Sequence, residues 1–258
     1  MIAEESKVLN EKFKGKKSTF VLVLGLSGTG KSTSFENLTP SESFLVNVMG
    51  KPLPFPGSDE YVAGQNMLVS ASSSEIQNEM KKFSDYSHKP EVKHFIIDDS
   101  QYIMATDFMQ RARVTGYEKW NILADNMWQI LVLASRLRGG LKVYILSHEE
   151  QDDQGRVRKM KTLGKLLDDK LTPEGLSTIV LFSGVAPGGD PGKQSQQYFF
   201  QTQNDGVACA KSPRGMFPFF IPNDLKIVSE RIDEYYEKKV KDWEKSELKL
   251  QELNIKRR

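Results

Sequence analysis

Short runs of apolar residues recur along the chain and are separated by polar or glycine-containing stretches. Thr19-Phe-Val-Leu-Val-Leu24 is the clearest run, and His94-Phe-Ile-Ile97 and residues 141–146 are similar. Continuous apolar runs, rather than alternating ones, are typical of parallel strands that are covered on both faces. We therefore expect buried strands at these three places, with further strands over 44–49, 67–69 and 178–182.

Helical spacing appears between the apolar runs. Ser74 is the expected N-cap of a helix that continues to Phe83, and residues 117–138 place apolar side chains at intervals of three and four. Gly139-Gly140 is expected to end the second of these helices. Residues from Asn223 onward are again helical in pattern and increasingly charged.

Strands that alternate with helices predict an α/β, doubly wound domain with a mainly parallel sheet flanked by helices. Residues 198–202 and 207–210 flank Asn204-Asp205-Gly206, which predicts an antiparallel edge hairpin. The expected division is a basic N-terminal lead-in (1–17), the α/β core (18–229) and a charged C-terminal helical tail (230–258).

Composition narrows the class of protein. The 258 residues include 36 Lys and Arg against 34 Asp and Glu, so the net charge is +2 and a global polycation is excluded. No apolar run approaches the roughly 18 residues of a membrane span, and residues 1–17 lack the apolar region of a secretory signal. The single Cys209 indicates a reducing compartment. We expect a cytoplasmic protein with no membrane partner.

A phosphate-binding loop follows the first strand. Gly25-Leu-Ser-Gly-Thr-Gly30-Lys31-Ser32 matches G-x-x-x-x-G-K-[ST], and the expected site comprises Gly25, Ser27, Gly28, Thr29, Gly30, Lys31, Ser32 and Thr33. Glycines let the loop direct backbone N–H groups at phosphates, and a helix after the loop is expected to add its dipole. Lys31 would reach the β- and γ-phosphates, and the Ser32 hydroxyl would bind Mg²⁺.

Acidic and polar residues end two other apolar runs. Asp98 follows one strand and is a candidate Mg²⁺ ligand through water, because ligands collect at the carboxyl ends of parallel strands; Asp99 would share that role or orient water. His148, in Leu146-Ser147-His148-Glu149, is a candidate to sense the γ-phosphate. The expected ligands are therefore ATP and Mg²⁺.

A basic segment follows the His148 strand. Residues 155–165 carry no acid, and their cations are Arg156, Arg158, Lys159, Lys161 and Lys165. Such a cluster can contact several phosphates of a nucleic acid and release counterions. A solvated charged loop is the alternative interpretation.

Several segments occur in an order that resembles the phage RecA-like ATPases, often called single-strand annealing or core-only recombinases. They are the phosphate loop, Ile96-Ile97-Asp98, Leu146-Ser147-His148-Glu149, Gly164-Lys-Leu-Leu-Asp-Asp-Lys170 with Pro173-Glu-Gly175, and Ala210-Lys-Ser-Pro-Arg-Gly-Met-Phe217 with Ile221-Pro-Asn-Asp-Leu225. The similarity covers about 19–236, and the last two segments are the most particular.

This resemblance implies a RecA-like P-loop ATPase that forms a homo-oligomeric ring or filament on single-stranded DNA, with ATP between subunits. Lys211 and Arg214 would then supply cations to a neighbour's γ-phosphate. The segment 150–171 would be one DNA-binding loop, and 106–117, with Arg111 and Arg113, the other. A single-strand DNA-binding protein is a further expected partner.

One departure from the resemblance concerns hydrolysis. RecA-type enzymes usually carry a glutamate after the second strand, but here Asn47-Val-Met-Gly-Lys-Pro52 contains no acid, and Glu60 is the substitute to test. Turnover could therefore be slow, or ATP could serve assembly alone. A DNA translocase or helicase on the same fold, and a P-loop kinase of a nucleotide or small molecule, remain as alternatives.

Overall fold

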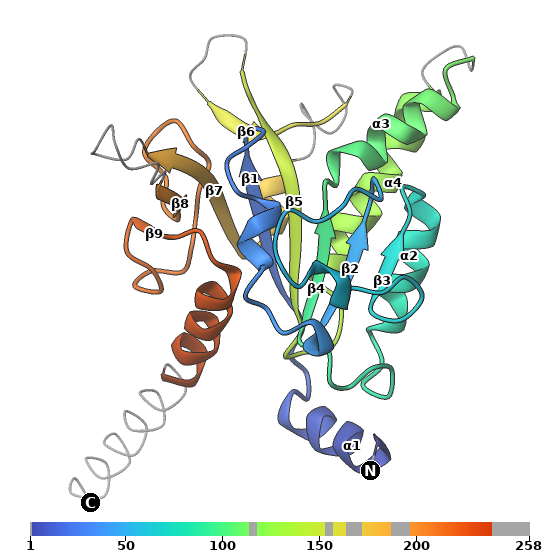
Figure 1. The fold of residues 1–258 in the computed structure, drawn as a ribbon, viewed down its shortest axis with the longest axis vertical. Helices are drawn as coiled ribbons and strands as arrows, with labels where there is room; N and C mark the ends of the chain where they lie inside the picture. Colours follow the sequence, from blue (N-terminus) through green and yellow to red (C-terminus); the bar gives the residue numbers. More distant parts are fainter. Residues whose placement is uncertain (1, 114–117, 153–156, 164–171, 187–196, 239–258) are drawn as a thin grey trace, which may run out of the picture.

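A computed structural model of the protein describes residues 2–113, 118–152, 157–163, 172–186 and 197–238. Within these residues a nine-stranded sheet has the order β3-β2-β4-β5-β1-β7-β8-β9, and β6 pairs with β5 outside this path (Figure 1). The strands are β1 (Thr19–Gly25), β2 (Ser43–Asn47), β3 (Met67–Val69), β4 (His94–Asp98), β5 (Lys142–Gln151), β6 (Arg158–Met160), β7 (Ile179–Ala186), β8 (Gln197–Gln201) and β9 (Phe220–Pro222).

Helices cover the sheet or connect its strands. Their bounds are α1 (Ile2–Lys12), α2 (Ser73–Lys82), α3 (Gln101–Gln110), α4 (Glu118–Ala134) and α6 (Pro173–Leu176), with 3₁₀ helices η1 (Ser32–Phe35), η2 (Pro40–Glu42) and η3 (Ser58–Glu60). A further helix begins at 225 and is described to 238, where the described residues end. Among the described residues, no helix is both long enough and apolar enough to span a membrane.

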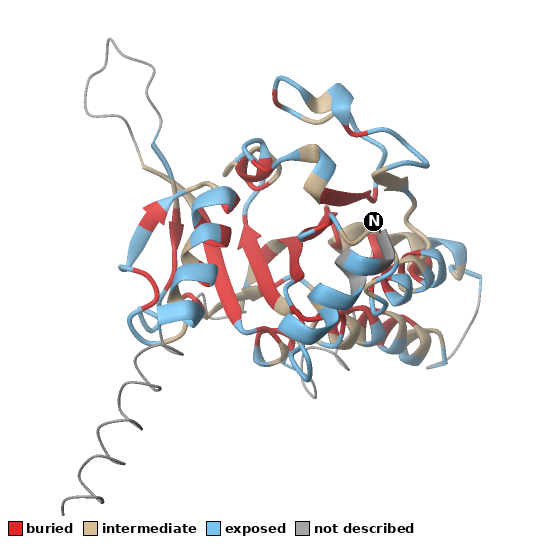
Figure 2. Cartoon of the chain, turned by 90° about the horizontal axis from the view of Figure 1, so that it is seen from below, coloured by how far each residue is buried: buried red, intermediate tan, exposed pale blue. Residues whose placement is uncertain are grey.

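The central strand β1 shows why its sequence is apolar throughout. Phe20, Leu22 and Leu24 belong to a core that includes α2, α3 and α4, whereas Val21 and Val23 belong to a second core with η1 and the helix 225–238. Alternate residues of a strand point to opposite faces, so both faces of β1 are buried. Figure 2 shows that the strands in the middle of the sheet consist largely of buried residues. The two cores fix the sheet between two layers, as expected for parallel strands.

The predicted fold class is confirmed: this is an α/β fold with a mainly parallel sheet flanked by helices and antiparallel strands at one edge. Six strands that are consecutive in the sheet run parallel: β3, β2, β4, β5, β1 and β7. At the edge beyond β7, β8 and β9 continue the sheet as antiparallel strands. The predicted hairpin between 198–202 and 207–210 was wrong. The strand β8 pairs with β7 and β9 and not with 207–210. Residues 208 and 211 instead form isolated bridges to Arg158 and Val180.

Helix boundaries differ from the sequence expectations in three places. The segment after the phosphate loop forms only the four-residue η1, since Pro40 disfavours helical backbone at the residue before it and Ser, Thr and Asn compete for backbone hydrogen bonds. The N-cap of α2 is Ser72, whose hydroxyl accepts from the Glu75 N–H. The helix α4 ends at Ala134.

The glycine pair after α4 therefore has another role than ending the helix. A side chain at Gly140, where φ is +82°, would begin 2.6 Å from the ring of Phe13, so the glycine lets the N-terminal segment pack there. The basic N-terminal lead-in expected over 1–17 contains the helix α1. At the other end, the helix 225–238 crosses the expected boundary at 230, and its Leu225, Val228 and Ile232 belong to the core.

Candidate nucleotide site

The phosphate loop connects β1 to η1 at the carboxyl edge of the parallel strands. Gly28 and Gly30 have φ values of +78° and +86°, in the region that favours glycine. Gly25 is buried, and a Cβ there would lie 2.9 Å from the carbonyl oxygen of Ser183 on the neighbouring strand. The glycine spacing is thus required by a tight turn and by close packing against β7. The four-residue η1 adds little helix dipole.

Lys31 is enclosed by its own loop. Its Nζ donates to the carbonyl oxygens of Gly25, at 2.9 Å, and Leu26, at 2.8 Å, and the residue is 6% exposed. Burial lowers the pKa of Lys31 below its ordinary value, although the carboxylates of Asp99 and Asp98 act in the opposite direction. A buried ammonium that donates to carbonyl oxygens can exchange them for a stronger, anionic acceptor.

Ser32 and Asp98 meet although 66 residues separate them. The Ser32 hydroxyl donates to Asp98 Oδ1 at 3.0 Å. Asp98 ends β4 and is 6% exposed; burial, together with the neighbouring charge of Asp99, raises its pKa to about 6. The hydroxyl and carboxylate oxygens are hard donors of the kind that Mg²⁺ prefers. Among the residues that the structure describes, no group of three or more His, Cys, Asp or Glu could hold a metal.

Asp99 directly follows Asp98 and forms an ion pair of its own. Its φ is +61°, an uncommon backbone conformation for a residue other than glycine. Asp99 Oδ2 lies 2.5 Å from Lys51 Nζ, and Oδ1 accepts from Gln101 Nε2 at 3.0 Å. Burial alone would raise the pKa of Asp99, but the hydrogen bonds from Lys51 and Gln101 outweigh it and lower the pKa.

His148 enters the same region from β5, the strand between β1 and β4. Its ring is 6.5 Å from that of Tyr102, and its backbone N–H donates to Gln101 Oε1 at 3.2 Å. Burial and the charge of Lys31 lower the pKa of His148, while Asp99 opposes them. The strand does not end at this residue as expected; β5 continues to Gln151 because its outer part pairs with β6.

These residues enclose one cavity of about 260 Å³. It lies between the phosphate loop, the segment after β2 and the ends of β4 and β5. Its lining comprises Ser27, Gly28, Lys31, Ser32, Asn47, Lys51, Pro52, Leu53, Pro54, Asp98, Asp99, Tyr102 and His148.

The opposite side of the phosphate loop is tied to the last part of the core. Ser183 Oγ donates to the carbonyl oxygen of Thr29, and Asn223 Nδ2 donates to Ser183 Oγ at 2.7 Å. Thr33 lies half-buried in η1. The Ile221-Pro-Asn-Asp segment, singled out in the sequence, thus supports the loop through Asn223.

Three predicted catalytic residues lie outside the cavity lining. Glu60 is exposed at the end of η3. Lys211 is half-buried beside β7, where burial lowers its pKa and Glu174 opposes that shift. Arg214 is exposed, and its carbonyl oxygen accepts from the hydroxyl of Tyr235. A role of Lys211 and Arg214 toward a neighbouring subunit stays a prediction.

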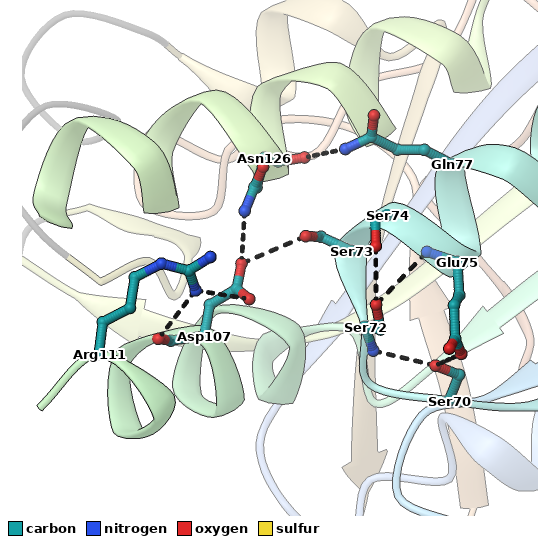
Figure 3. Close-up of polar contacts among 9 residues, drawn as sticks. All are labelled: Ser70, Ser72, Ser73, Ser74, Glu75, Gln77, Asp107, Arg111 and Asn126. Atoms are coloured by element: carbon teal, nitrogen blue, oxygen red, sulfur yellow. Dashed lines mark hydrogen bonds and ion pairs between the residues drawn. The ribbon is translucent and has the colours of Figure 1, made fainter.

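Arg111 lies at the end of α3 in a polar cluster that joins three helices (Figure 3). The buried Asp107 accepts from Ser73 on α2, at 3.3 Å, and from Asn126 on α4, at 2.8 Å; Arg111 Nη1 lies 3.2 Å from its other oxygen. The first residues of the expected DNA-binding loop 106–117 are thus the last turn of α3. There, Asp107 links α3 to α2 and α4.

The other predicted DNA-binding cations have unlike surroundings. Arg158 makes a forked contact with buried Glu149, with Nη2 2.7 Å from Oε2, and its guanidinium lies 5.1 Å from the ring of Phe182. Arg113 and Lys161 are exposed and Lys159 is half-buried. Arg156 and Lys165 lie outside the described residues. Arg158 is thus a structural residue in this chain, while the exposed cations keep their predicted role as a hypothesis.

Sequence reasoning missed Lys51 and Tyr102 as parts of the site. Both follow strands at the edge where the phosphate loop lies, so their positions after β2 and β4 were the available signal.

Comparison with known proteins adds little to this geometry. No protein-family model matches the chain, and no curated protein matches its sequence. Among solved structures, the X-ray structure of the Legionella pneumophila ATPase DotB is similar at 9% identity and a TM-score of 0.32. The match covers 77% of this chain and 49% of that one, so the chain spans about half the length of DotB.

Proposed function

We propose that this chain is a magnesium-dependent ATPase. The observation that carries the proposal is the 3.0 Å hydrogen bond between Ser32 of the phosphate loop and Asp98 at the end of β4. A hydroxyl after the loop lysine and a carboxylate on a nearby strand are the groups that bind Mg²⁺ with a nucleoside triphosphate.

The loop would bind the phosphates with groups that, without nucleotide, form hydrogen bonds within the loop. Lys31 would exchange the carbonyl oxygens of Gly25 and Leu26 for β- and γ-phosphate oxygens, which form stronger, charge-assisted hydrogen bonds. Backbone N–H groups of the loop would contact the remaining phosphate oxygens.

Ser32 and Asp98 would hold the magnesium ion. Their oxygens fit this metal, which binds few protein groups and keeps water and phosphate oxygens as its other ligands. When bound, the ion neutralises charge on the phosphates.

Hydrolysis then requires a water molecule aligned with the terminal phosphorus. The water oxygen forms a bond to phosphorus, the bond to the bridging oxygen breaks, and its electron pair stays on ADP. The water proton ends on inorganic phosphate. Asp99 and His148 both line the cavity and can accept or donate a hydrogen bond there, whereas Glu60 does not line it.

Nucleotide binding by calorimetry and phosphate release test the proposal. Lys31→Met should abolish both, whereas Lys93→Met, on an exposed lysine paired with Glu42, should change neither. Glu60→Gln should leave turnover unchanged. A wild-type protein that binds no ATP with magnesium, or a Lys31→Met variant as active as the wild type, would refute the assignment.

We further propose that the ATPase acts on single-stranded DNA as a homo-oligomer. Support comes from the ordered motifs that resemble the phage recombinases and from the connection between the site and the basic segment. The Lys161 backbone N–H donates to the carbonyl oxygen of His148 at 2.9 Å, so an exposed cation is attached next to the proposed γ-phosphate position. Annealing or strand exchange is the proposed reaction.

Fluorescence anisotropy of labelled single-stranded DNA, with and without an ATP analogue, tests this second proposal. Lys161→Ala should weaken binding and reduce its salt dependence, because one phosphate contact is lost; Lys93→Ala is the matched control. No binding at low salt in either state refutes it. Directional unwinding would instead indicate a translocase. A protein that stays monomeric and phosphorylates a nucleotide would be a kinase, and DNA-dependent assembly without phosphate release would limit ATP to binding.

A further inference from the structure

Lys51 belongs to no nucleotide-binding motif, yet it lines the same cavity as the phosphate loop. Its ammonium nitrogen lies 2.5 Å from Asp99 Oδ2 and 5.1 Å from the centre of the Tyr102 ring. The side chain remains 55% exposed. A long, flexible cation held at one point and otherwise open to the cavity can change its anionic partner.

The backbone that carries Lys51 is held from inside the site. Asn47, the last residue of β2, is in register with Asp98 on β4, and its Nδ2 donates to the Lys51 carbonyl oxygen at 2.7 Å. Pro52 follows directly and restricts the backbone of Lys51 to extended conformations. The position of this lysine at the cavity is therefore set by contacts of its own segment.

Asp99 is held in an unusual conformation to face this lysine. Its φ of +61° costs energy for a non-glycine residue, and such conformations concentrate at functional sites. Gln101 fixes the second carboxylate oxygen at 3.0 Å. The cavity lining thus includes two lysines, Lys31 and Lys51, and the carboxyl groups of Asp98 and Asp99.

A triphosphate would change this balance more than a diphosphate. Its terminal group adds charged oxygens that compete with one carboxylate for an ammonium, and hydrogen bonds to charged acceptors are the strong ones. Lys31 and Ser32 are already assigned to phosphates and magnesium. Lys51, the other lysine in the cavity lining, is therefore the cation left to bind the oxygens of the terminal phosphate.

We propose that Lys51 is a sensor of the terminal phosphate within the same chain, held by Asp99 without nucleotide and transferred to the terminal phosphate oxygens when a triphosphate binds. A diphosphate leaves the Lys51–Asp99 pair in place. Lys51 thereby sets the preference for triphosphate over diphosphate. This inference rests on the proposed nucleotide-binding function.

The test compares the affinities of AMPPNP and ADP by calorimetry, in magnesium and in EDTA, for wild type, Lys51→Met and Lys51→Arg. Lys51→Met should weaken AMPPNP binding about 10- to 100-fold and ADP binding less than about threefold. Lys51→Arg keeps the charge and should retain most of the preference. Lys93→Met is the matched control, since Lys93 is equally exposed and pairs with Glu42 at the same 2.5 Å.

The outcomes separate the two levels of the proposal. A wild type that binds neither nucleotide refutes the nucleotide-binding function and this inference with it. A wild type that binds both, with an unchanged AMPPNP-to-ADP ratio in Lys51→Met, refutes the sensor alone. An equal loss for both nucleotides would make Lys51 a general phosphate contact and also overturns the inference. Thermal unfolding without nucleotide should show one cooperative transition for both Lys51→Met and Lys93→Met, so that a loss of nucleotide affinity is not a loss of folding.

Discussion

Replacement of Arg158 by methionine is expected to destabilise the fold, although the sequence placed this residue on a DNA-binding segment. Its guanidinium contacts both oxygens of Glu149, whose side chain is 4% exposed. Methionine keeps an apolar stem against Phe182 but leaves the carboxylate buried without its charged partner. Breaking a buried pair from one side is costly for this reason, by about 3–5 kcal/mol.

Methionine also offers no hydrogen-bond donor to the oxygens of Glu149, which accept from Nε and Nη2 of Arg158. The lost hydrogen bonds therefore add to the cost of the unpaired charge. Glutamine at position 149 removes that charge and keeps a side chain of similar size.

Urea unfolding of wild type, Arg158→Met and Arg158→Met/Glu149→Gln at pH 7.5 measures this cost. The single variant should lose several kcal/mol, and the double variant should recover most of the loss, because no charge is buried. A single variant within about 1 kcal/mol of wild type at pH 7.5 that has lost DNA binding would contradict the structural role.

Three further outcomes follow from the site and the core. Ser32→Ala removes the hydroxyl beside Asp98, so calorimetric ATP affinity should fall about tenfold with magnesium and change little in EDTA; an equal fall in both would separate the hydroxyl from the metal. Gly25→Ala places a Cβ 2.9 Å from the Ser183 carbonyl oxygen, so the loop must shift and ATP binding should weaken; unchanged affinity would contradict the close packing. Burial lowers the pKa of His94 to about 3 from 6.5, so its contribution to stability is complete above pH 6.5 and is lost as pH falls. Between pH 7.5 and 5.5 the wild type should lose about 1.4 kcal/mol more unfolding free energy than His94→Gln, and equal losses would exclude His94 as the titrating group.

Local patterns were sufficient for much of the fold. The run that became β1 predicted a strand covered on both faces, and the strands that end on Asn47 and Asp98 were also expected. The expected pairing of β8 was wrong because a strand has two edges, and sequence proximity does not decide which segment occupies them. Here β7 and β9 take both edges.

In the candidate site, too, some contacts could be predicted from the sequence and others could not. Gly25, Lys31 and Ser32 lie within one short motif, and Asp98 follows a strand whose direction places it at the same edge, so their proximity could be foreseen. The Lys51 contact with Asp99 could not, since 48 residues separate the two and neither position belongs to a recognised spacing.

The sequence by itself determined the apolar strands, the glycine pattern of the phosphate loop and the order of the polar residues at strand ends. These depend on local backbone preferences and on the period of apolar residues. Only the tertiary structure decided which charges are paired: Arg158 with Glu149, and Lys51 with Asp99. Such pairs depend on strand order and on burial, which set distances between residues that are far apart along the chain.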